Sequence, residues 1–146
     1  MTTSTYHHLA RVGETLEKTV SFTRQEISEV ATILGDTNPI HHDEAFAAKT
    51  RFGSIIVAGP HVSRLHITMC ADHFSKRGGM LGLEFSTAYR AAVLPDIQLT
   101  MRWRVDKAEL KPKMGGMIVE LSGDITDPDG NVLVESFGKA LVVDQL

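Results

Sequence analysis

The residues of this sequence best suited to chemistry are a carboxylate and an imidazole, Asp36 and His41, with a proline between them. Side chains five residues apart point roughly 140° apart on an α-helix and to opposite faces of a β-strand. Pro39 fixes its own φ and keeps Asn38 out of the helical region, so the chain must bend between the two groups. Such a bend can direct both side chains at one point. An acid–base pair that acts on a single water molecule needs this arrangement.

Helices on both sides of the bend are predicted to hold it in place. The sequence Thr23–Glu26 has the pattern of a capping box, which opens a helix. Gly35 is placed to end that helix. Apolar residues recur between these points at helical spacing and predict one buried face: Ile27, Val30, Ala31 and Leu34. After the bend, Asp43 is positioned to cap a short helix over residues 44–49. Asp36 and His41 are therefore expected on a loop between packed helices, a common place for catalytic residues.

A long helix is predicted to begin at Gly59-Pro60, since proline is well suited to the first helical position. It is expected to run to about Phe74. Its apolar positions cover a wide arc, which indicates a helix mostly enclosed by other structure. Those positions are Val62, Leu65, Ile67, Met69, Cys70, Ala71 and Phe74.

From Leu81 onward, apolar and polar residues alternate with the period of β-strands. Residues 99–106 alternate most regularly, and residues 118–125 and 132–143 flank a turn signal at 127–130. An irregular lead-in is predicted over residues 1–14, and a first strand follows at residues 16–22. A turn at Gly78-Gly79 is predicted to separate the long helix from the later strands. One strand, helices and about four antiparallel strands predict an α+β fold, in which the long helix packs against a curved antiparallel sheet.

Length and composition narrow the function classes. The 146 residues are 42% apolar and 23% charged, which predicts one domain over residues 1–146. A net charge of −3 argues against a nucleic-acid partner. The longest aliphatic run, Ile55–Ala58, is too short to cross a membrane, and residues 1–11 lack the apolar core of a signal peptide. The single Cys70 excludes an internal disulfide, and a cytoplasmic location is expected.

The segment 35–59 resembles the MaoC-like, or R-specific enoyl-CoA hydratase, family of hot-dog proteins. The resemblance rests on four pieces that occur in order: Gly35–His41, Asp43–Ala47, Arg51–Gly53 and Ile56–Gly59. It implies a single hot-dog domain with a central helix wrapped by the sheet. It also implies an acyl-CoA substrate, no separate cofactor, and a homodimer or dimer of dimers. Free edges of a single curved sheet favour such pairing on physical grounds as well.

By this resemblance, Asp36 and His41 hold and activate the water that adds across the double bond of a 2-enoyl-CoA, and Gly59 offers its N–H to the thioester oxygen. Elementary chemistry agrees with these roles. The addition needs a base for the water, a proton for C2 and stabilisation of negative charge on the thioester oxygen. The N-terminus of a long helix supplies the last of these. The function predicted is an R-specific enoyl-CoA hydratase, which in reverse is a 3-hydroxyacyl-CoA dehydratase.

Three further residues are candidates for substrate binding. Asn38 supports the bend. Ala58 stands where many relatives carry histidine before the helix-start glycine, so it affects the shape of the acyl pocket. Ser63 lies one turn into the long helix, where it either touches substrate or packs the helix. Candidates for the phosphates of coenzyme A, each with an ordinary solvated charged face as the alternative, are Lys76, Arg77, Arg102 and Arg104.

Two other functions stay open on the same scaffold, an acyl-CoA thioesterase and a non-catalytic acyl-CoA-binding hot-dog subunit. The pairing of Asp36 with His41 favours hydration, because C2 needs a proton donor and hydrolysis of the thioester has less use for one. A non-catalytic subunit would not need both Asp36 and His41. His42 and Asp43 beside His41 have poor geometry for a metal ion, and no metal site is predicted.

Overall fold

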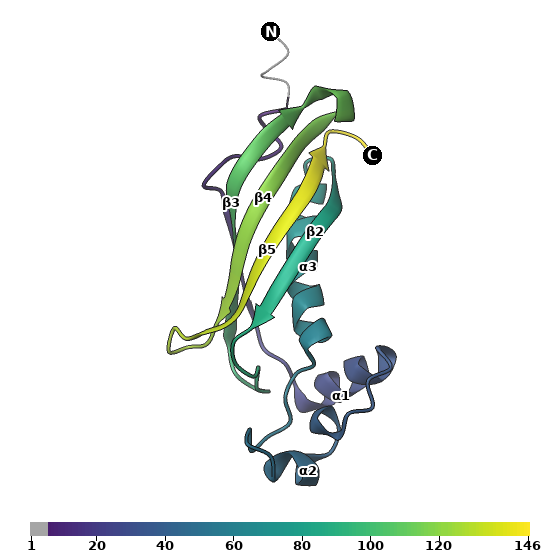
Figure 1. Ribbon diagram of the computed structural model, residues 1–146, viewed down its shortest axis with the longest axis vertical. Helices are drawn as coiled ribbons and strands as arrows, with labels where there is room; N and C mark the ends of the chain where they lie inside the picture. Colours follow the sequence, from purple (N-terminus) through teal and green to yellow (C-terminus); the bar gives the residue numbers. More distant parts are fainter. Residues whose placement is uncertain (1–5) are drawn as a thin grey trace.

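The computed structural model describes residues 6–146, in which a curved antiparallel sheet lies against one long helix (Figure 1). The strands are β1 (Thr15–Val20), β2 (Gly79–Tyr89), β3 (Leu99–Lys111), β4 (Gly116–Thr126) and β5 (Val132–Val143). The helices are α1 (Arg24–Ile33), α2 (Glu44–Ala48) and α3 (Gly59–Ser75), with 3₁₀ turns η1 (Pro39–His41) and η2 (Pro112–Met114). No helix within residues 6–146 is both long and apolar enough to cross a membrane.

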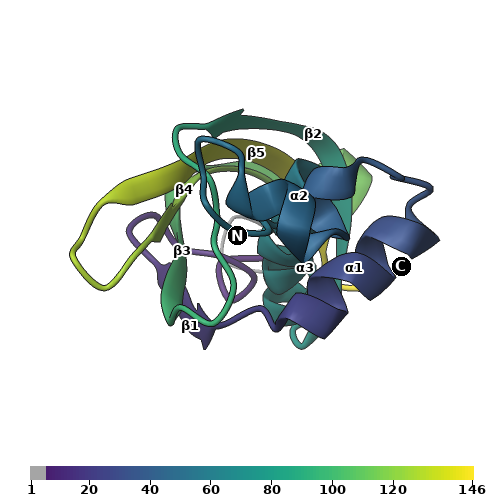
Figure 2. The same ribbon diagram turned by 90° about the horizontal axis from the view of Figure 1, so that it is seen from below.

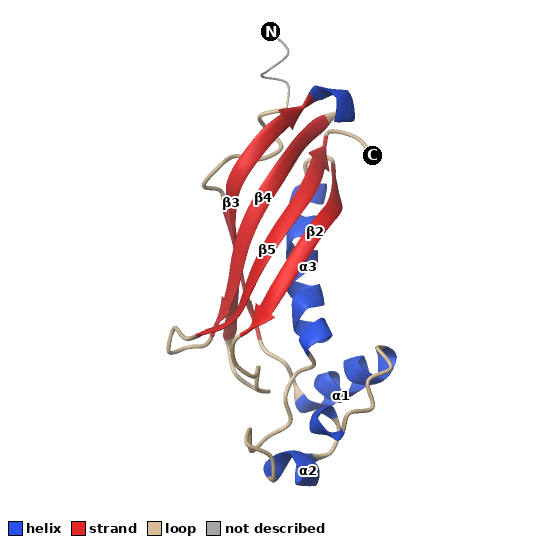
Figure 3. Cartoon of the chain, viewed as in Figure 1, coloured by secondary structure: helices blue, strands red, loops and turns tan. Residues whose placement is uncertain are grey.

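The five strands pair in the order β1-β3-β4-β5-β2, and every pair is antiparallel. Figure 2 shows the sheet curving around α3, while α1 and α2 lie beyond the N-terminal end of α3 (Figure 3). The predicted α+β arrangement, a central helix wrapped by a curved antiparallel sheet, is confirmed. β1 and β2 are the edges of the sheet, each paired with one strand only.

Some boundaries differ from the prediction. The first strand ends at Val20 rather than at residue 22, because Phe22 leaves the ladder and packs in the core at 1% exposure. The turn after α3 lies over residues 76–78, and Gly79 already pairs with Val143 as the first residue of β2. The predicted lead-in is irregular from Tyr6 to Glu14, and residues 1–5 lie outside the described part of the chain.

Trp103 anchors the core between α3 and the sheet. It is fully buried, and its indole N–H donates to the carbonyl of His66 at 2.7 Å. The rings of Trp103 and His66 stack with centroids 4.3 Å apart. Gly123 opposite Trp103 has to lack a side chain, because an added Cβ would lie 2.6 Å from the indole. The apolar stripe of β3 is thereby fixed against the helix.

One predicted core position of α3 was wrong. Leu65 is 37% exposed, and the neighbouring His66 is fully buried in its place. Burial is tolerable because both ring nitrogens have partners, the hydroxyl of Ser136 at 3.3 Å and the carbonyl of Arg102 at 3.0 Å. Burial also lowers the pKa of His66, which keeps the imidazole neutral.

Glu14 joins the N-terminal lead-in to the end of α3. Its carboxylate, 11% exposed, accepts hydrogen bonds from Arg77 at 2.6 and 3.0 Å and lies 2.6 Å from Nε2 of His73. Arg77 also donates to the carbonyl of the fully buried Leu9. Burial alone would raise the pKa of Glu14, but these hydrogen bonds outweigh it and lower that pKa to about 2. The cluster of Glu14, His73 and Arg77 thus holds Leu9 against the sheet.

Candidate active site

Asp36 is placed by the way α1 ends. The helix begins as a capping box, in which Thr23 accepts from the N–H of Glu26 and the Glu26 side chain reaches back to Thr23. It ends at Ile33 with Leu34 as its C-cap, and the following Gly35 adopts a φ of +79°, a conformation that glycine enters without strain. The N–H of Gly35 donates to Thr32 and that of Asp36 to Ala31, the pair of bonds that defines a Schellman motif. Asp36 is therefore fixed as the second residue beyond the C-cap, Leu34.

The loop after Asp36 is held by two side chains that mimic backbone turns. The Asp36 Oδ1 accepts from the N–H of Asn38 at 2.9 Å, and the Asn38 Oδ1 accepts from the N–H of Ile40 at 3.3 Å. Pro39 occupies the first position of the turn η1, which carries His41 as its last residue. Asn38 thus shapes the bend through the hydrogen bond between its side chain and the backbone of Ile40, and Asn38 itself is exposed.

The structure brings Asp36 and His41 together. The Asp36 Oδ2 and the His41 Nε2 are 3.3 Å apart, with side-chain exposures of 35% and 8%. The His41 Nδ1 lies 2.8 Å from the carbonyl of Ile56. Since a carbonyl can only accept, Nδ1 carries a proton and Nε2 faces the carboxylate. A carboxylate oxygen and an imidazole nitrogen are thus presented to the same point.

His42 holds this loop against α1, a role that no local pattern in the sequence indicates. Its Nε2 lies 2.7 Å from the backbone carbonyl of Asp36, and its Nδ1 lies 2.7 Å from the hydroxyl of Ser28 on α1. Because the carbonyl can only accept, Nε2–H is the donor and Ser28 donates to Nδ1. The imidazole of His42 thereby ties the Asp36 backbone to the preceding helix.

Gly59 is the first residue of α3, and Ala58 is its N-cap, which provides no side-chain hydrogen bond. Within residues 6–146 no oxygen accepts the N–H of Gly59. The phenol of Tyr89 donates to the Gly59 carbonyl at 2.8 Å. The Tyr89 ring also covers the Cα of Gly59, where an added Cβ would lie 3.0 Å from the ring. The close approach at Gly59 is therefore made by Tyr89.

A cavity of about 430 Å³ lies beside Gly59. Its walls are apolar apart from the Gly59 backbone, the Tyr89 hydroxyl and Arg90, whose guanidinium pairs with Glu135 at 2.8 Å. Its lining residues are Phe52, Ile56, Val57, Gly59 and Tyr89–Val93. Ile56 connects this cavity to the acid–base pair, because it lines the wall while its carbonyl holds His41.

The other candidate residues do not line this cavity. Asp36 lines a separate hollow of about 380 Å³ with Pro39 and His42. Ala58 is buried, and the Ser63 hydroxyl donates back to the carbonyl of Pro60 at 3.4 Å. The structure thus brings Asp36 and His41 together but places Gly59 in a different hollow of the single chain.

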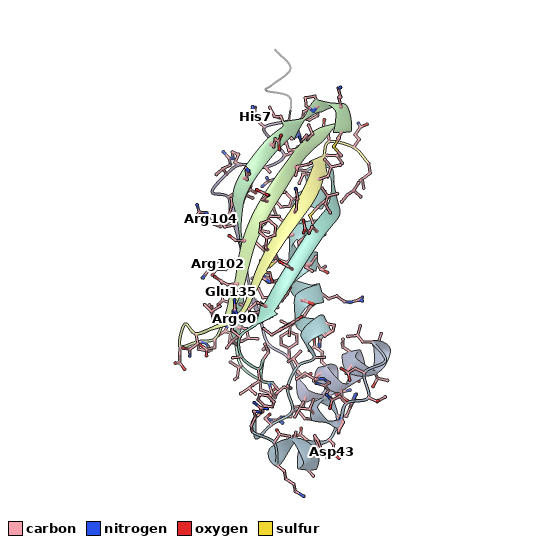
Figure 4. The ribbon with its side chains drawn as sticks, in the orientation of Figure 1. His7, Asp43, Arg90, Arg102, Arg104 and Glu135 are labelled. Atoms are coloured by element: carbon pink, nitrogen blue, oxygen red, sulfur yellow. The ribbon has the colours of Figure 1, made fainter. Side chains whose placement is uncertain are left out.

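The four basic candidates for coenzyme A phosphates each lie near a carboxylate of the described chain. The pairs are Lys76–Asp72 at 3.1 Å, Arg77–Glu14 at 2.6 Å, Arg102–Glu17 at 3.0 Å and Arg104–Asp106 at 3.6 Å. Figure 4 shows Arg102 and Arg104 on the sheet, away from the segment that carries Asp43. Arg102 and Arg104 are therefore not part of the Asp36–His41 site in the single chain.

Comparison with known proteins identifies the family. The family model described as MaoC like domain matches residues 9–122. The chain belongs to the MaoC-like domain family. Its hot-dog fold matches R-hydratase PhaJ1 from Pseudomonas aeruginosa with a TM-score of 0.81 at 22% identity, over 92% of this chain and 83% of that one.

Two other solved structures extend this MaoC-like comparison. An (R)-hydratase from A. caviae involved in PHA biosynthesis matches with a TM-score of 0.81 at 25% identity, over 91% of this chain and 97% of that one. A chain of the ChsH1-ChsH2 complex from Mycobacterium tuberculosis matches with a TM-score of 0.78 at 16% identity, over 91% and 98%. No curated protein matches the sequence.

Proposed function

We propose that this MaoC-like chain is an R-specific 2-enoyl-CoA hydratase, which in reverse acts as a 3-hydroxyacyl-CoA dehydratase. The observation that carries the proposal is the 3.3 Å approach of the Asp36 carboxylate to the His41 imidazole. Membership of a family described as MaoC-like and the fold shared with two R-hydratases support the same activity.

In the proposed reaction, Asp36 accepts a proton from a water molecule as its oxygen bonds to C3 of the enoyl thioester. His41, carrying protons on both ring nitrogens, delivers the Nε2 proton to C2, and both groups act from one side of the double bond. The proton taken up by Asp36 then returns to the His41 Nε2, 3.3 Å away, which restores both groups. In this proposal the thioester spans the two hollows at Ile56, which lines the Gly59 cavity and bonds His41, and the N–H of Gly59 at the positive end of α3 stabilises the negative charge that develops on the thioester oxygen. Loss of one such donor typically raises a barrier by roughly 3–4 kcal/mol. Every step uses this chain's own groups and the coenzyme A thioester, without an added cofactor.

A homodimer is part of the proposal. The outer edge of β2 pairs with no strand within residues 6–146, and it carries Leu81 and Leu83, each 49% exposed. A long, partly apolar edge favours pairing with another chain. A two-fold arrangement of two copies would cover the β2 edge of each copy at once. A cytoplasmic location belongs to the same proposal.

The test uses crotonyl-CoA and follows two signals, the absorbance of the enoyl thioester and the release of free thiol. The proposal predicts that the absorbance falls without free thiol. Free thiol would instead identify a thioesterase. If neither signal changed across several acyl chain lengths, the chain would be a binding subunit, and the proposed activity would be wrong.

A further inference from the structure

Tyr89 makes a contact at the N-terminus of α3 that the proposed reaction does not account for. It lies at the end of β2, and its side chain meets the first residue of a helix thirty positions earlier in the chain. The phenol donates to the Gly59 carbonyl at 2.8 Å. Tyr89 is nevertheless 50% exposed, so the contact is not explained by burial in the core.

Both the ring and the hydroxyl of Tyr89 contact Gly59. A Cβ added at residue 59 would lie 3.0 Å from Cζ, 3.2 Å from Cε1 and 3.2 Å from the hydroxyl oxygen of Tyr89. The φ of Gly59 lies outside the left-handed region. A side chain at residue 59 would therefore be in tight contact with the tyrosine ring, and the backbone conformation itself does not call for glycine.

These two contacts restrain the first residue of α3 from outside the helix. Glycine is the most flexible residue of a chain, and the N-cap Ala58 supplies no side-chain hydrogen bond. Tyr89 restrains Gly59 at both the carbonyl and the Cα, from a strand of the sheet. The direction of the Gly59 N–H depends on the same torsions that these contacts restrain.

Tyr89 and Gly59 also share the cavity of about 430 Å³. Arg90, the charged residue of its lining, is paired with Glu135, and the other walls are apolar. Such a cavity favours an uncharged, apolar segment of a ligand over a charged one. In an acyl thioester, the acyl chain next to the carbonyl has this character.

We propose that Tyr89 is a positioning residue, which holds the Gly59 N–H toward the thioester oxygen and provides a wall for the acyl chain. The inference rests on the proposed hydratase function. Tyr89 does not exchange a proton with the substrate, since its hydroxyl proton is directed at the Gly59 carbonyl.

The test compares Tyr89→Phe with a matched control, Tyr6→Phe. Tyr6 packs against the core cluster that contains Leu9 and Trp103, toward the C-terminal end of α3, so its hydroxyl lies outside the proposed site. We expect Tyr89→Phe to lower kcat for crotonyl-CoA hydration by about 3- to 10-fold, the effect of one lost hydrogen bond. KM should change less than about twofold, because the ring remains. Tyr6→Phe should leave both constants unchanged.

A second measurement follows the melting temperature and needs no activity. Gly59→Ala should lower the melting temperature in the wild-type chain to the extent that the new methyl group, 3.0 Å from the Tyr89 ring, displaces that ring. The same change should lower it much less when Tyr89→Ala has removed the ring. Equal losses in the two backgrounds would overturn the contact on which the inference depends.

The outcomes separate the inference from the proposed function. If the wild type hydrates crotonyl-CoA and Tyr89→Phe keeps its kcat, the positioning role is wrong while the hydratase function stands. A loss of kcat in Tyr89→Phe that merely parallels a loss of melting temperature would also overturn the positioning role. If the wild type itself does not hydrate crotonyl-CoA, the proposed function fails, and the inference fails with it.

Discussion

Two backbone carbonyls determine how the imidazoles around Asp36 are oriented. The carbonyl of Ile56 fixes the proton of His41 on Nδ1, and the carbonyl of Asp36 fixes that of His42 on Nε2. His41 therefore presents Nε2 to the carboxylate, while His42 can only hold the loop. Two adjacent histidines thus have different roles because of the acceptor that each one meets.

Ser28→Ala tests the clamp made by His42. The change removes the hydroxyl that donates to Nδ1 and should lower the free energy of unfolding by about 1 kcal/mol. Because the Asp36 loop is then less firmly held, we expect kcat for crotonyl-CoA hydration to fall by about 2- to 5-fold. Urea unfolding and steady-state kinetics measure the two effects.

The control for this clamp is Gln25→Ala in the same helix. Gln25 is an exposed residue whose side chain donates to Glu29 one turn away and makes no other hydrogen bond within residues 6–146. Its removal should change neither quantity appreciably. Equal effects of the two variants on kcat would show that the clamp does not act through His42.

At the scale of elements, the end of α1 determines where Asp36 lies. Gly35→Ala places a side chain at a φ of +79°, which costs about 1–2 kcal/mol, although an added Cβ there meets no atom within 4 Å. Gly130 in the turn between β4 and β5 has a φ of +84° and equally open surroundings, so Gly130→Ala is a matched control. Both changes should destabilise the chain alike, but only Gly35→Ala should lower kcat. Equal kcat values for the two variants would show that the end of α1 does not affect catalysis.

The lead-in before β1 depends on a carboxylate that is charged in the folded chain. Since the pKa of Glu14 falls from its ordinary 4.5 to about 2 on folding, its stabilisation is present above pH 4.5 and is lost as the pH falls through about 2. Glu14→Gln should lower the free energy of unfolding at pH 7 by about 2 kcal/mol. The difference in melting temperature between wild type and variant should shrink from pH 5 to pH 2.5. A difference independent of pH would contradict the role of the charge.

Local signals in the sequence were sufficient for much of the fold and for the Asp36–His41 bend. The capping box at Thr23, the glycine at residue 35 and the proline at residue 39 each act through their own backbone, so their effect can be predicted from neighbouring residues. The order of the elements followed from hydrophobic periodicity. The bend brought the acid and the imidazole together as expected.

Contacts between distant residues could not be predicted in the same way. His66 reads as polar in the helical pattern, but it is buried because Ser136 and the carbonyl of Arg102 satisfy it, 70 and 36 residues away. Tyr89 reads as an ordinary strand residue, although it meets Gly59 across 30 residues. The acidic partners of the basic candidates for phosphate binding likewise could not be predicted from the sequence, because these ion pairs depend on strand register and helix packing.

At the scale of the whole molecule, we predict a homodimer that forms through the edge of β2. Sedimentation should give twice the chain mass of 16.0 kDa. Leu83→Lys should weaken the dimer, because it places a charge on a partly apolar edge. Ile33→Lys, on the exposed side of α1, is the control and should leave the dimer intact. A stable wild-type monomer would contradict this part of the account.

The rate of crotonyl-CoA hydration by Asp36→Asn shows whether Asp36 is the base that activates water. The amide keeps an oxygen that can accept from the N–H of Asn38, so the loop should keep its shape and the melting temperature should change little. Because the base that activates water is lost, we predict a rate lower by about 10²- to 10⁴-fold. A folded variant that retains the wild-type rate would contradict the assignment of Asp36 as that base.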